Sequence, residues 1–221
     1  MRPIRVFASY LSVLLLVACA AAPPFADRIE PDASVREAVA ATARTVALRE
    51  VAVVVHVGHA VRAELRPDRS LHVWRGLLLR TVDEGELAFA LAHELAHDAL
   101  AHPFPARGDA RDVGQELAAD ARARDGLAAV GFDPAAGASL LRALREEASV
   151  ADADASSLAE LDRRIAAFGD IDPSHGVRSD DPWRAVWQSL RDAWLAADPA
   201  SGDAKRRAVL ERHVAAARRA R

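Results

Sequence analysis

The first regular hydrophobic pattern of the chain lies between residues 31 and 49 and has the period of a helix. Its apolar positions repeat every three or four residues, at Val35, Val39, Ala43 and Val46. Asp32 precedes the first of them, and a short acidic side chain at that place suits a helix N-cap. The pattern predicts an amphipathic helix with one buried face.

A second pattern, of β-branched residues and turns, follows between residues 51 and 74. The run 51–57 is rich in valine, and two shorter apolar runs, one ending at Leu65 and one spanning 71–74, flank a turn composition at 66–69. Runs of this kind, separated by turn residues, predict strands. We expect them to form a small antiparallel sheet.

From Glu86 almost to its end the chain has helical periodicity, which is interrupted by prolines and glycines. The predicted fold class is therefore helix-rich α+β. A length of 221 residues, with 51% hydrophobic residues and a net charge of -3, excludes a disordered tail and a polytopic membrane protein. The chain is not basic before its last twenty residues, so nucleic acid is not an expected partner.

The N-terminus has the pattern of an export signal. Arg2 and Arg5 precede the uncharged run 6–18, which is shorter than the ~20 residues of a membrane span. Its end, Leu16-Val17-Ala18-Cys19, resembles the lipobox of bacterial lipoproteins, and the resemblance implies cleavage before Cys19 and lipidation of that residue. An uncleaved anchor, or a chance cysteine beside an ordinary signal, remains the alternative.

These observations divide the chain into a signal peptide at residues 1–18, a lipidated cysteine with its tether at 19–30, and one folded domain at 31–221. Cys19 is the single cysteine, so no internal disulfide is available to the domain. Ala20 after the cysteine, where inner-membrane lipoproteins carry aspartate, favours the outer membrane, facing the periplasm. The lipid would be the contact with the membrane.

Residues 93–97 read His-Glu-Leu-Ala-His within a helical, largely apolar stretch. Residues four apart lie one turn above each other on a helix, so both imidazoles face one point and suit a divalent metal. Glu94 is placed to act as general base on a water at that metal, which predicts peptide hydrolysis. Two core histidines satisfied by hydrogen bonds are the alternative.

A second acidic pair, Glu116 and Asp120, again has the spacing of one helical face. Glu116 can supply the third protein ligand of a site for one zinc ion, and Asp120 can accept the outer N–H of a ligand histidine. Taken alone, such a pair is typical of a solvated surface. His102, about 140° round the helix from His97, is predicted to lie off the ligand face and to cap the helix end.

The segments 73–102 and 115–120, with Gly-Phe-Asp-Pro at 131–134, resemble the core of the M48 family of zinc metallopeptidases. The resemblance covers roughly residues 35–145. It implies a zincin fold of the gluzincin type with zinc on His93, His97 and Glu116, Glu94 as general acid and base, and Asp120 in support. It also implies that the sheet edge around 58–64 binds protein or peptide substrates in extended form.

The chain departs from that family in two places. Only eighteen residues separate His97 from Glu116, where many members carry a longer segment. The downstream family element, a His-Pro followed by Arg, has no full match. His175 is the nearest candidate for a catalytic histidine that donates to the oxyanion, with Arg178 or Arg184 as its support.

The sequence therefore predicts a lipid-anchored zinc metalloendopeptidase of the cell envelope that cuts unfolded or misassembled proteins. The incomplete downstream element leaves a second function open. In that alternative the chain is a catalytically inactive, zinc-stabilised binding or chaperone-like lipoprotein.

Overall fold

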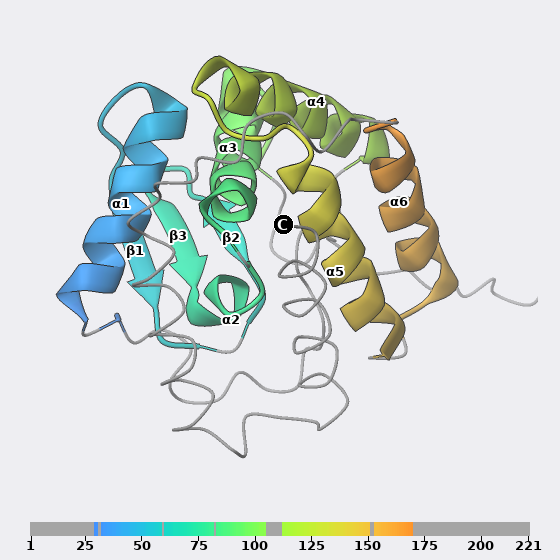
Figure 1. The fold of residues 1–221 in the computed structure, drawn as a ribbon, viewed down its shortest axis with the longest axis horizontal. Coiled ribbons are helices and arrows are strands. Elements are labelled where there is room, and N and C mark those ends of the chain that lie inside the picture. Colours follow the sequence, from blue (N-terminus) through green and yellow to red (C-terminus); the bar gives the residue numbers. More distant parts are fainter. Residues whose placement is uncertain are drawn as a thin grey trace, which may run out of the picture.

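The structure is a computed structural model that describes residues 29–30, 32–58, 60–81, 83–104, 112–150 and 153–169. These residues form a helix-rich α+β fold, which confirms the predicted fold class (Figure 1). In chain order the elements are α1 (Ala33–Ala47), β1 (Val53–His56), β2 (Ala63–Leu65), β3 (Leu71–Trp74), α2 (Arg75–Leu78), α3 (Glu84–Ala99), α4 (Val113–Ala129), α5 (Ala136–Val150) and α6 (Ala155–Ala166).

Helix α1 forms where the first hydrophobic pattern predicted it. The Asp32 side chain caps its N-terminus by accepting the N–H of Ser34 at 2.9 Å. Val35, Val39 and Ala43 are fully buried on one face of the helix, as their spacing requires.

The sheet is mixed rather than antiparallel, which corrects the expectation from the sequence. Its strand order is β1-β3-β2, with β1 parallel to β3 and β2 antiparallel to β3. β2 follows β1 in the chain but does not pair with it, and the tight 66–70 turn after β2 places β3 between the two strands. Of the two strand pairs in the described sheet, β2–β3 is the one with the antiparallel pairing that short turns produce.

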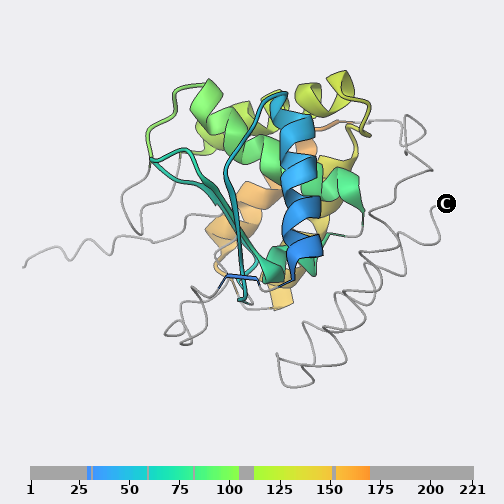
Figure 2. The ribbon, with the colours of Figure 1, turned by 90° about the vertical axis from the view of Figure 1, so that its left-hand side faces the viewer.

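Helices α1 and α3 lie on the same face of the sheet, and α4 crosses the end of α3 (Figures 1 and 2). The Asp83 side chain caps α3 by accepting the N–H of Glu86 at 3.0 Å. α3 packs against α1, α4, α5 and β2, so it is buried on nearly all sides. A helix in this position buries its polar residues as well, and those residues need partners inside the protein.

The predicted export signal at residues 1–18 and Cys19 lie outside the described residues. Ile29 and Glu30, which end the predicted tether, contact the domain. Ile29 pairs with His56 at the edge of β1, and the Glu30 carboxylate accepts from Arg75 Nε at 2.9 Å. Within the described ranges no helix combines the length and the apolar character that crossing a membrane requires.

Candidate metal centre

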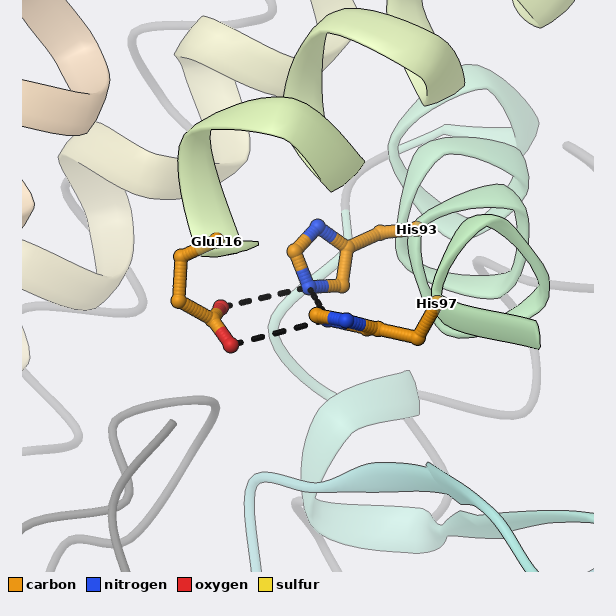
Figure 3. Close-up of side chains that lie close together, drawn as sticks. All are labelled: His93, His97 and Glu116. Atoms are coloured by element: carbon orange, nitrogen blue, oxygen red, sulfur yellow. Dashed lines mark hydrogen bonds and ion pairs between the residues drawn. The ribbon is translucent and has the colours of Figure 1, made fainter. Parts of the chain in front are cut away.

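Three buried side chains from two helices meet beside α3 (Figure 3). His93 and His97 come from α3, and Glu116 comes from the first turn of α4. Their relative exposures are 0%, 2% and 2%. Asp112 caps α4 by accepting the N–H of Gly114 at 2.8 Å, so the helix begins at the point that brings Glu116 over α3.

The donor atoms of this group are spaced as the ligands of one ion would be. The Nε2 atoms of His93 and His97 lie 3.0 Å apart, and they lie 3.3 and 3.5 Å from the Glu116 carboxylate oxygens. In a tetrahedral zinc site with bonds of about 2.0–2.1 Å, neighbouring ligand atoms lie about 3.3–3.4 Å apart. Two imidazoles and one carboxylate at these separations could hold a metal ion.

Asp120 lies behind His93, as the sequence predicted for a residue that supports a ligand histidine. Its Oδ1 is 2.7 Å from His93 Nδ1, the ring nitrogen opposite Nε2. A carboxylate in this position keeps a proton on Nδ1 and leaves Nε2 to face the centre.

The acidic residues govern the charge of His93. Burial alone would lower the pKa of His93, but Asp120 and Glu116 outweigh burial and raise that pKa to about 9. Burial would likewise raise the pKa of Asp120, yet His93 and Arg164 lower it to about 2. The negative charges that stabilise a proton on His93 would also stabilise a metal cation. At Nε2, which faces Glu116, a metal and a proton would therefore compete.

Arg164 of α6 contacts this centre although the motifs of the sequence do not predict it. Its guanidinium donates from Nε to one Asp120 oxygen at 2.7 Å and from Nη2 to the other at 2.8 Å, and Nη1 lies 3.1 Å from Glu116 Oε2. Arg164 is only 1% exposed. It ties α6 to α4 and balances two buried carboxylates.

A signal for Arg164 was present in the sequence. It lies three residues after Leu161, on the stripe of α6 that is buried and that also includes Ser157 and Glu160. An arginine on the buried stripe of an amphipathic helix needs an acidic partner inside the protein. From the sequence, the expected supporting arginine is instead Arg178 or Arg184.

Glu94, the predicted general base, is 3% exposed and lies next to the sheet. Its Oε2 accepts the backbone N–H of Leu65 in β2 at 3.2 Å. The predicted base and the strand predicted to bind substrate are therefore adjacent.

His102 is closer to the centre than predicted. Its Nδ1 lies 2.8 Å from His97 Nδ1. The predicted angle of about 140° assumed that the helix continues to His102. α3 ends at Ala99, and Ala101 adopts a left-handed conformation with φ 53°, which turns the chain back towards the last helical turn.

The structure thus brings together His93, His97, Glu116 and Asp120. Glu94 is buried on the same helix as the two histidines, and its carboxylate contacts Leu65 of β2. His175, Arg178 and Arg184 lie outside the described residues, so their predicted roles stay predictions.

No protein-family model matches the chain, and a search of curated proteins finds no significant match. The resemblance to the M48 family therefore remains a prediction from the motifs, and what this centre does must be argued from its own residues.

Proposed function

We propose that this chain is a zinc-dependent metalloendopeptidase with a gluzincin-type centre. The observation that carries the proposal is the convergence of the His93, His97 and Glu116 donor atoms, with Glu94 on the same helix and hydrogen-bonded to the neighbouring strand. Support also comes from burial, because a helix packed on nearly all sides would carry apolar residues at these positions unless their polar groups had a use.

In this proposal His93, His97 and Glu116 hold one zinc ion per chain. Zinc suits the donor set because two imidazoles and one carboxylate leave a fourth position open in tetrahedral geometry. When bound, it would lower the pKa of a water ligand towards about 7 and polarise the scissile carbonyl. Asp120 keeps His93 in the tautomer that presents Nε2, and Arg164 holds Asp120 and Glu116 in place.

Glu94 is the proposed proton carrier. A carboxylate next to the metal ligands takes the proton of the attacking water and delivers it to the leaving amine. The Leu65 N–H fixes one Glu94 oxygen, Oε2, and thereby orients the carboxylate. Since Glu94 is almost fully buried, it also lies in surroundings that strengthen its electrostatic interactions.

Strand β2 is the proposed binding edge for an extended peptide. Among the described strands it lies at the end of the sheet. Arg62 C=O and Arg66 N–H bond towards β3, so the alternation of an antiparallel pair points the backbone groups of Ala63 and Leu65 away from β3. Ala63 and Leu65 are only 2% and 4% exposed, so this edge must become accessible before a peptide can bind there. Leu65 N–H donates there to Glu94, so a peptide added to this edge would run beside the proposed base.

Binding through backbone groups depends little on the side chains of the substrate. This mode therefore suits unfolded or misassembled proteins, which expose extended segments of varied sequence. The predicted export signal at 1–18 and the likeness of Leu16–Cys19 to a lipobox support a location in the cell envelope, with Cys19 as the proposed site of the lipid anchor. The proposed location is the outer membrane, facing the periplasm.

The Glu94→Gln variant tests the proposal. Glutamine keeps the shape of the side chain and can still accept from Leu65 N–H, but it cannot take a proton. We expect the wild type to cleave a fluorescently labelled unfolded protein with zinc present, and we expect Glu94→Gln to retain zinc and lose cleavage.

A Glu94→Gln variant that still cleaves would contradict the proposed base. Retention of zinc and of peptide binding by the wild type, with no cleavage of any unfolded substrate, would favour the catalytically inactive binding protein instead.

A further inference from the structure

The turn that ends α3 has the hydrogen bonds of a Schellman motif. Ala101 N–H donates to Asp98 C=O at 3.0 Å, and His102 N–H donates to His97 C=O at 2.9 Å. Ala101, which sits between them, has the left-handed φ of 53° that this motif requires. In this motif the residue after the left-handed residue commonly contacts a side chain in the last turn of the helix. Here these two residues are His102 and His97.

The two rings meet at their Nδ1 atoms. The distance of 2.8 Å between His97 Nδ1 and His102 Nδ1 is that of a hydrogen bond, and the ring centroids lie 5.0 Å apart. A hydrogen bond between two imidazole nitrogens has one donor and one acceptor. One of the two Nδ1 atoms therefore carries the shared proton and the other accepts it.

The other nitrogen of His97 decides which ring is the donor. His97 Nε2 faces His93 Nε2 and the Glu116 carboxylate, on the side of the proposed metal. An imidazole nitrogen binds a metal only when it carries no proton, so the proton of a neutral, metal-binding His97 must be on Nδ1. His102 is then the acceptor and carries its own proton on Nε2.

We propose that His102 is a positioning residue that selects the metal-binding tautomer of His97 and fixes its ring. The inference rests on the proposed function, because it concerns the zinc ligand His97. His102 does for His97 what Asp120 does for His93, with a neutral acceptor in place of a carboxylate.

His102 is not itself a ligand. Its Nδ1 is directed at the Nδ1 edge of His97, and the donor atoms that lie close enough to share an ion belong to His93, His97 and Glu116. Nor is its ring needed to fill the core, because His102 is partly exposed at the end of the helix. Removal of its acceptor should weaken metal binding while the fold persists.

Two variants of similar size separate the acceptor from the bulk of the ring. His102→Asn offers an amide oxygen near the place of Nδ1, whereas His102→Leu fills similar space and accepts no hydrogen bond. Zinc affinity is measured for the full chain by competition with a chromophoric chelator at a fixed neutral pH. Thermal unfolding in EDTA reports whether each metal-free variant folds like the wild type.

We expect His102→Leu to bind zinc about 10–100-fold more weakly than the wild type, the usual effect of losing a hydrogen-bond partner behind a ligand histidine. We expect His102→Asn to stay within about 3-fold of the wild type on the same grounds. In EDTA both variants should unfold close to the wild-type temperature. The cobalt-substituted wild type and His102→Asn should share one visible spectrum that His102→Leu does not reproduce.

Wild-type affinity in His102→Leu would overturn the inference and leave the zinc site standing. Equal losses in His102→Leu and His102→Asn would also overturn it, because the ring itself and not its acceptor would then matter. A wild type that binds no zinc would overturn the proposed function and this inference together, so the two failures are distinguishable.

Discussion

Replacement of Arg164 by methionine removes the guanidinium behind the candidate metal centre and keeps most of the side-chain volume. The Arg164 side chain is 2% exposed, and its partners Asp120 and Glu116 are 3% and 2% exposed. Methionine fills most of the space of the arginine side chain between α4 and α6 but leaves both carboxylates without its positive charge. We expect the variant to fold with reduced stability.

The magnitude follows from the burial of the ion pairs. Loss of one partner of a buried pair costs about 3–5 kcal/mol, because the charge left behind remains out of water. Folded domains have a free energy of unfolding of about 5–15 kcal/mol, so the loss is a large fraction of the total. For a domain of this size it corresponds to roughly 6–20 °C in Tm. Zinc should reduce the loss, because a cation would compensate part of the charge on Glu116.

The assay is urea unfolding of the wild type and Arg164→Met, with EDTA and with zinc. Arg145→Met is the matched control. Arg145 pairs with Asp162 between the neighbouring helices α5 and α6 with similar geometry, at 2.9 and 3.2 Å, but both side chains face solvent and the pair should contribute little. A loss in Arg164→Met below about 1 kcal/mol in EDTA, or equal to that of the control, would refute the reasoning.

Two further predictions concern the metal and a helix cap. His97→Ala should bind no zinc, so zinc should not stabilise it. In the wild type zinc should raise the free energy of unfolding by about 4 kcal/mol at a zinc concentration 1,000-fold above Kd. Thermal unfolding of both proteins with and without zinc measures the difference. Asp154→Ala should cost about 1 kcal/mol at pH 7, because the Asp154 carboxylate caps α6 by accepting from Ser156 and Ser157 N–H at 3.0 Å. Hydrogen bonds from the two serines lower the pKa of Asp154 from 3.8 to about 2, so its contribution is complete above about pH 4 and is lost as the pH falls through 2. The stabilities of the wild type and Asp154→Ala should converge over that range, and a difference as large at pH 2 as at pH 7 would contradict the role of the carboxylate.

Local patterns in the sequence predict the parts of the centre that lie on one helix. The four-residue spacing of His93 and His97 puts both imidazoles on one face of α3, and the same spacing pairs Glu116 with Asp120 on α4. The apolar surroundings of α3 also indicate its burial. The spacing does not say which helices meet. The prediction that α3 and α4 meet comes from the chemistry of the site, because two imidazoles and one carboxylate form a common set of zinc ligands.

Features that depend on tertiary packing or on an unusual backbone were not predictable. The pairing direction of β1 depends on which strand lies beside it in the sheet, and its hydrophobic pattern is the same for either direction. His102 reaches His97 because Ala101 is left-handed, a conformation that glycine usually signals in a sequence and alanine does not. The contact of Arg164 with α4 depends on how α6 packs against α4, which local patterns do not specify.

The zinc content of the purified protein shows whether His93, His97 and Glu116 form a zinc site. Elemental analysis of the wild type and Glu116→Ala, after removal of loosely bound metal, measures it. We expect about one zinc per chain in the wild type and a clear loss in Glu116→Ala, because two histidines alone leave a three-ligand site incomplete. No metal in the wild type, or equal zinc in both proteins, would contradict this expectation.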